Sequence, residues 1–192
     1  MDRHVLWAPL EQPGLEHLHL IQNDELIIAD SVILGVYGQV PFRIQYQISC
    51  DSHWSLHNVQ LKLLSSSPRE LNLSTDGIGT WTNELGEVIP SLNGCLDIDI
   101  SATPYTNTLP IRRLALKPGM STTLNMVYIA VPQLQVTGVE QRYTCLEATR
   151  DGGRYRYESL NKGVTEFTAE LPVDSDGLVI DYPGLFRRVG IR

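Results

Sequence analysis

The chain contains few cysteines, and their positions argue against stabilisation by disulfide bonds or by structural zinc. Its 192 residues include Cys50, Cys95 and Cys145, with no CxxC pair and no paired Cys and His spacing. An odd number of widely separated cysteines argues against a disulfide framework and against a structural zinc site. Three reduced and mostly buried thiols are expected instead, as is usual for free cysteine.

The motifs of common enzymes and cofactor sites are also missing. The sequence holds no GxSxG, GxGxxG, P-loop or HExxH pattern, so no cofactor is expected. Asp174 to Gly177 begin like a calcium loop but lack its later ligands. His17 and His19 share a strand face, yet two imidazoles without a third placed ligand indicate surface residues. No metal ligand and no catalytic residue is assigned.

Long apolar runs and positive charge are scarce as well. No stretch reaches the ~18 apolar residues of a membrane-spanning helix, and the first 14 residues lack the apolar core of a secretory signal. With 15 basic and 22 acidic residues the net charge is −7, which argues against nucleic acid or an anionic membrane as partner. We expect a cytoplasmic protein without a transmembrane segment; its oligomeric state is not predicted.

Strand-type alternation dominates what is present. Residues 42–50 alternate Phe, Ile, Tyr, Ile and Cys with Arg, Gln, Gln and Ser, the pattern of a half-buried strand. Similar strands recur about every 10 to 14 residues between turns rich in Gly, Pro, Asn, Asp and Ser. The sequence predicts one all-β domain over residues 1–192, an antiparallel sandwich, barrel or roll.

Four segments depart from this alternation. Leu109 to Leu116 has helical spacing, with Pro110 suited to a first turn. Pro183 to Arg187 reads either as a short helical turn or as a tight turn. Leu124 to Val131 and Leu178 to Ile180 are apolar on both faces, which predicts strands buried on both sides. Such strands line either a filled core or a lipid-sized cavity.

The most informative stretch is residues 94–114, GCLDIDISATPYTNTLPIRRL. Asp97 and Asp99 lie on one strand face, roughly 6.5 to 7 Å apart, and repel each other unless donors or cations surround them. Adjacent residues on a helix point about 100° apart, so one of Arg112 and Arg113 is expected to face inward. That arginine either forms a buried ion pair with Asp97 or Asp99, or offers a planar fork to a phosphate or carboxylate.

Hydroxyl and amide side chains fill the turn between this strand and the helix. Thr103, Tyr105 and Asn107 either hydrogen-bond their own backbone, as turn residues do, or face the hydroxyls of a carbohydrate. Tyr143, Tyr155 and Tyr157 occupy strand positions, where they either pack in the core or line the mouth of a pocket.

Residues 94–114 resemble the signature of the bacterial putative glycolipid-binding family. Further matching segments are Cys50-Asp51 with Trp54, Asp76 to Trp81, Gln141 to Tyr143, Arg154 to Glu158, and Asp176 to Arg188. The resemblance spans nearly the whole chain. It implies a spiral β-roll similar to the lipoprotein carriers of the outer-membrane localisation pathway, whose open roll cradles acyl chains, and it implies fold more strongly than function.

The leading hypothesis is a non-enzymatic binding protein for an amphipathic ligand such as a glycolipid, with an apolar cavity and a polar rim. The first alternative is a hydrolase or transferase that uses Asp97 and Asp99, and the second is a module that binds partners through an exposed edge strand. The predicted ligand-binding residues are Asp97, Asp99, Thr103, Tyr105, Asn107, Arg112, Arg113, Tyr143, Tyr155 and Tyr157.

Overall fold

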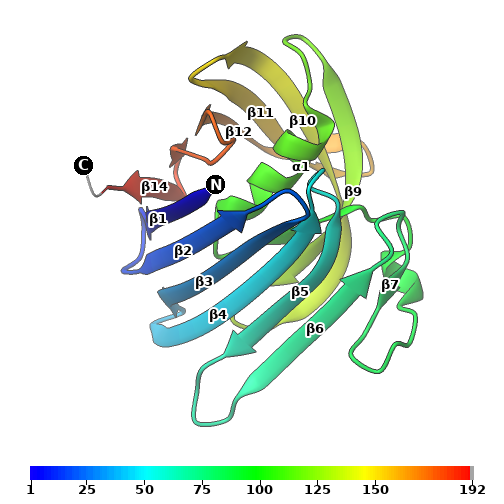
Figure 1. The fold of residues 1–192 in the computed structure, drawn as a ribbon. Coiled ribbons are helices and arrows are strands. Elements are labelled where there is room, and N and C mark those ends of the chain that lie inside the picture. Colours follow the sequence, from blue (N-terminus) through cyan, green and yellow to red (C-terminus); the bar gives the residue numbers. More distant parts are fainter. Residues whose placement is uncertain (191–192) are drawn as a thin grey trace.

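The computed structural model describes residues 1–190 and contains two open sheets (Figure 1). The nine-stranded sheet has the order β13 (Asp181–Tyr182), β14 (Phe186–Val189), β1 (Asp2–Pro9), β2 (Leu15–Gln22), β3 (Leu26–Tyr37), β4 (Val40–Asp51), β5 (Leu56–Leu63), β6 (Arg69–Thr75) and β7 (Trp81–Thr82). The five-stranded sheet has the order β12 (Val164–Asp174), β11 (Gly152–Asn161), β10 (Gln135–Thr149), β9 (Ser121–Ala130) and β8 (Asp97–Ile100).

The predicted β-rich, mostly antiparallel fold is confirmed, with one difference. β8 pairs with β9 in parallel, because the chain between them passes through the helical segment and returns in the same direction. Within residues 1–190 the strands form two open sheets rather than a closed barrel.

The helical segment lies between the two sheets (Figure 1). A 3₁₀ turn, η2 (Tyr105–Asn107), leads into α1 (Thr108–Leu114), and a further 3₁₀ turn, η1 (Pro90–Leu92), precedes β8. The helix predicted over Leu109 to Leu116 is therefore present, but it ends two residues earlier. Ala115 takes a left-handed conformation with φ of 45° and stops the helix there. No helix of the described residues is long and apolar enough to cross a membrane.

Strand alternation divides the buried side chains between two clusters. On β4 the residues Ile44, Tyr46, Ile48 and Cys50 are buried, as the alternation predicts. The first core cluster lies mainly on the nine-stranded sheet, and the second lies mainly on β10, β11 and β12. β9 contributes Val127 and Ile129 to the first cluster and Leu124 and Met126 to the second, so the predicted burial on both faces is confirmed from Met126 onward, whereas Asn125 is exposed.

The C-terminal predictions are corrected in part. Leu178 and Val179 are fully buried, but Ile180 is exposed and the segment makes only an isolated bridge from Val179 to Val173 instead of a strand. Residues 182–185 form a tight turn, in which the backbone N–H of Leu185 donates to the carbonyl of Tyr182 at 2.9 Å. The helical alternative for Pro183 to Arg187 is therefore wrong, since Phe186 and Arg187 belong to β14.

The three cysteines behave as predicted. Cys50, Cys95 and Cys145 are buried and unpaired within the described part of the chain. Cys50 and Cys95 belong to the first core cluster and Cys145 to the second, so each acts as a small apolar side chain.

Candidate ligand-binding site

Asp97 on β8 is joined to α1 by an ion pair. The Arg113 guanidinium donates to both oxygens of the fully buried Asp97 carboxylate, with Nε at 3.4 Å from Oδ1. This confirms that one arginine of the pair faces inward and meets one of the two acids. Burial raises the pKa of Asp97, and the hydrogen bonds and charge of Arg113 oppose that rise.

Asp99 lies on the same face of β8 and has its own donors. Gln141 on β10 donates from Nε2 to Oδ2 at 2.6 Å, and the hydroxyl of Thr106 donates to Oδ1 at 3.4 Å. Burial raises the pKa of this carboxyl as well. Both acids are therefore engaged by neighbouring side chains, as expected for groups that position β8 against α1 and β10.

The polar turn before α1 is buried. Thr103 accepts the backbone N–H of Tyr105 at 3.0 Å, and Asn107 donates from Nδ2 to the carbonyl of Pro104 at 3.2 Å. These contacts are the turn chemistry that the sequence offered as one of two alternatives. The turn lies in the protein interior instead of forming a rim that faces solvent.

Two of the three predicted tyrosines pack beneath this turn. The Tyr143 hydroxyl donates to Oδ1 of Asn107 at 2.9 Å, and its ring meets Tyr157 edge-on with centroids 5.5 Å apart. Tyr157 also meets Tyr182 edge-on at 6.1 Å. Burial raises the pKa of Tyr143 and of Tyr157 above the usual range, so both rings stay neutral.

The remaining predicted residues, Arg112 and Tyr155, line a small cavity of about 250 Å³. We call it the Arg112 cavity; Ala148, Gly153, Asp174 and Gly177 also line it. The Arg112 guanidinium stacks 5.3 Å from the centre of the Trp54 ring, a cation–π contact that holds its side chain.

A larger cavity of about 390 Å³ opens between the nine-stranded sheet and the end of β9. We call it the Glu16 cavity; its walls include Trp7, Ile33, Phe42, Tyr128, Ala130 and Val131. Leu34 and Tyr37, which also line it, are largely exposed at its margin. The volume and the mainly apolar walls fall within the usual range for sites that bind small molecules.

Glu16 is a buried acid in this apolar wall. It lies on the inward face of β2, and its Oε1 accepts the hydroxyls of Ser31 at 2.8 Å and Tyr46 at 2.6 Å. Among residues 1–190, its other oxygen, Oε2, has no hydrogen-bonding partner. A buried polar atom without a partner costs about 1 to 3 kcal/mol, so Oε2 is a natural point of attachment for a ligand group.

The protonation of Glu16 is set by its surroundings. Burial raises its pKa to about 7, against the opposing effect of the neighbouring hydroxyls of Tyr46, Thr103 and Ser31. Near neutral pH both forms of the carboxyl are populated. Oε2 can therefore accept a hydrogen bond in one form and donate one in the other, and a hydroxyl group satisfies both.

The predicted residues are not gathered into one site. Asp97, Tyr105, Asn107, Tyr143 and Tyr157 are buried and Asp99 and Arg113 are half-buried, while Arg112 and Tyr155 line the Arg112 cavity. Thr103 alone lies near the Glu16 cavity, since its hydroxyl is close enough to Glu16 to lower the pKa of that acid. Neither Asp97 nor Asp99 is among the residues that line these two cavities.

Glu16 was missed at the level of sequence although a signal was present. Side chains alternate along β2, so His17 and His19 point outward while Leu18 and Leu20 point inward. The same alternation places Glu16 on the inward face. A charged residue in phase with buried leucines marks either a partnered acid or a ligand site.

Comparison with known proteins gives one family and one solved structure. Residues 4–188 match the family described as "Putative glycolipid-binding". A crystal structure of a DUF1089 family protein from Pseudomonas aeruginosa is 37% identical and has a TM-score of 0.78; the match covers 91% of this chain and 92% of that one. No curated protein matches significantly. Since the match takes in nearly all of its residues, the chain belongs to the putative glycolipid-binding family.

Proposed function

We propose that the protein binds an amphipathic ligand, a glycolipid, in the Glu16 cavity, without catalysing a reaction. The two open sheets would act together as a roll that cradles the ligand. The observation that carries the proposal is a buried acid in a mainly apolar cavity, with one oxygen that has no partner among residues 1–190. The family description supports the choice of ligand class.

The walls of the cavity supply the two kinds of contact that such a ligand needs. Trp7, Ile33 and Phe42 offer apolar surface to an alkyl or acyl chain. A hydroxyl of the ligand bonds to Oε2 of Glu16 in either protonation state of the acid. An alkane cannot form the hydrogen bond to Oε2, and a free sugar has no chain to cover the apolar wall.

Isothermal titration with n-octyl glucoside below its micelle concentration tests this proposal. We expect binding of one molecule per chain, and roughly tenfold weaker binding of the permethylated glucoside, which has the same chain but no hydroxyl donors. Mass spectrometry of lipids extracted from the purified protein would identify a ligand carried from the cell.

Two matched variants distinguish the two cavities. Ala130→Phe places a ring in the Glu16 cavity, and Ala148→Phe places the same ring in the Arg112 cavity. We expect Ala130→Phe to abolish binding of octyl glucoside and Ala148→Phe to leave it unchanged. The reverse result would assign the ligand to the Arg112 cavity and overturn the proposal.

A further inference from the structure

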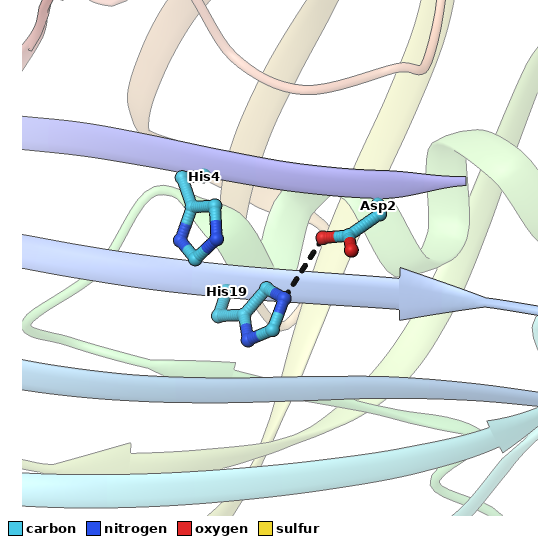
Figure 2. A group of neighbouring side chains, drawn as sticks. All are labelled: Asp2, His4 and His19. Atoms are coloured by element: carbon cyan, nitrogen blue, oxygen red, sulfur yellow. Dashed lines mark hydrogen bonds and ion pairs between the residues drawn. The ribbon is translucent and has the colours of Figure 1, made fainter.

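Three potential metal ligands meet on the outer face of the nine-stranded sheet. Asp2 and His4 on β1 lie next to His19 on β2, as Figure 2 shows. His4 faces His19 directly across the antiparallel pair. Asp2, two residues before His4, lies on the same face because side chains alternate along a strand. This face is opposite to the one that carries Glu16, so the cluster is independent of the proposed ligand cavity.

The spacing of the three ligand atoms suits a single metal ion. One atom from each residue lies within 4.8 Å of the other two. Nε2 of His19 is 2.9 Å from Oδ1 of Asp2, and the His4 and His19 rings stack with centroids 4.2 Å apart. Tetrahedral zinc with bonds of about 2.0 to 2.1 Å needs ligand atoms roughly 3.4 Å apart. The two rings are stacked nearly parallel, and an imidazole binds a metal in the plane of its ring, so the His4 and His19 side chains must rotate apart to direct their nitrogens at one ion.

A fourth residue orients the site. Nδ1 of His4 lies 3.0 Å from Nε2 of His17, the next outward residue on β2. This contact leaves the other ring nitrogen of His4 available, and Figure 2 shows a nitrogen of that ring turned toward Asp2 and His19. Metal-binding histidines commonly donate their second N–H to a neighbouring acceptor, which fixes the ring and its tautomer.

The backbone around the cluster is held in place. The backbone N–H of Gln22 donates to the carbonyl of Met1 at 2.8 Å, so the paired strands extend to the end that carries Asp2. Asp2 and His4 are exposed and His19 is half-buried, which leaves the ion accessible to water at its open position. Two imidazoles, one carboxylate and an open position form a set typical of zinc and related divalent transition metals.

We propose that Asp2, His4 and His19 bind a divalent transition metal ion, with Zn²⁺ as the reference ion, and that His17 positions His4. Each chain binds one ion. His4 and His19 supply nitrogen, Asp2 supplies oxygen, and water completes the coordination. In the bound state His4 donates its Nδ1–H to Nε2 of His17.

Titration calorimetry with zinc chloride, on protein stripped of metal with a chelator, tests the proposal. We expect one ion per chain with micromolar or tighter affinity. His4→Ala and His19→Ala remove nitrogen ligands and should each weaken binding by well over tenfold. His17→Ala removes only the positioning contact and should weaken binding by about tenfold. All are exposed or half-exposed strand positions, and circular dichroism confirms that each variant is folded.

The chain provides its own control. The other two of its five histidines are His53 and His57, and both are exposed and outside the cluster. The double variant His53→Ala, His57→Ala should bind zinc like the wild type. Cobalt substitution gives a second readout, since a strong visible absorption band reports tetrahedral coordination and should disappear in His19→Ala. Binding only at millimolar zinc, or equal affinity in His19→Ala and wild type, would overturn the proposal.

Discussion

Arg113 in α1 forms an ion pair with Asp97, whose side chain is fully buried on β8. The pair connects the two ends of the motif in residues 94–114. One end is a strand of the five-stranded sheet, and the other is the helix between the sheets. The motif therefore acts first as a brace that fixes α1 against β8.

Removal of Arg113 should be strongly destabilising. Arg113→Ala leaves the Asp97 carboxylate buried without its counter-ion, and breaking one side of such a pair costs about 3 to 5 kcal/mol. Urea denaturation followed by fluorescence measures the free energy of unfolding. Arg187→Ala is the matched control, because Arg187 pairs with Asp181 at 3.3 Å in solvent and such exposed pairs contribute about 1 kcal/mol or less. Equal losses in the two variants would contradict the role of the brace.

Two buried tyrosines should respond differently to loss of the hydroxyl group. Within residues 1–190 the hydroxyl of Tyr105 has no partner, whereas that of Tyr143 donates to Asn107 at 2.9 Å. Tyr143→Phe should cost about 1 to 3 kcal/mol because it leaves Oδ1 of Asn107 buried and unpaired. Tyr105→Phe should be neutral or stabilising. Thermal unfolding of both variants checks the contrast, and a large loss in Tyr105→Phe would show that its hydroxyl has a partner.

Local patterns predicted the strands and the inward arginine because both follow from backbone geometry. Alternation along a strand and the 100° step of a helix hold wherever the element lies. The polar turn at Thr103, Tyr105 and Asn107 was harder to interpret. Hydroxyls are equally suited to solvent and to their own backbone, and burial between two sheets depends on packing that no local pattern contains.

The surroundings of Glu16 could not be predicted for a related reason. Its partners Ser31 and Tyr46 lie 15 and 30 residues away on β3 and β4. The register of two successive hairpins brings them together. The same limit applies to His19: its neighbour His4 comes from β1, and only the β1–β2 register makes a pair of histidines into a three-ligand cluster.

The turn before the motif depends on a close approach of two glycines. Gly79 has a φ of 112°, its carbonyl accepts the N–H of Gly94 at 2.9 Å, and a Cβ on Gly79 would lie 3.0 Å from Cα of Gly94. Gly79→Ala should therefore lower the free energy of unfolding by more than Gly86→Ala. Gly86 also has a positive φ, but its Cβ would meet open space, so its substitution should cost only about 1 to 2 kcal/mol of backbone strain. Equal losses in urea denaturation would mean that the close approach is unimportant.

The buried acid in the cavity should make stability depend on pH. Below about pH 4.5 Glu16 is protonated in both the folded and unfolded states. As the pH rises toward 7 the unfolded state releases its proton while the folded state, with a pKa of about 7, retains it. The folded state then binds more protons, so stability falls with rising pH and levels off above about pH 7. The rise in the pKa of Glu16 from 4.5 to about 7 corresponds to a loss of about 3 kcal/mol in the free energy of unfolding.

Glu16→Gln isolates this effect. Glutamine resembles the protonated acid and still accepts from Tyr46, but it does not titrate. The buried acids Asp97 and Asp99 titrate in both proteins and cancel in the comparison. Denaturation at pH 4 and pH 8 should show the variant gaining stability relative to wild type as the pH rises. Glu158→Gln should show the opposite sign, because Arg142 lowers the pKa of Glu158 and its contribution is lost as the pH falls. A pH-independent difference between Glu16→Gln and wild type would show that Glu16 is not the titrating group.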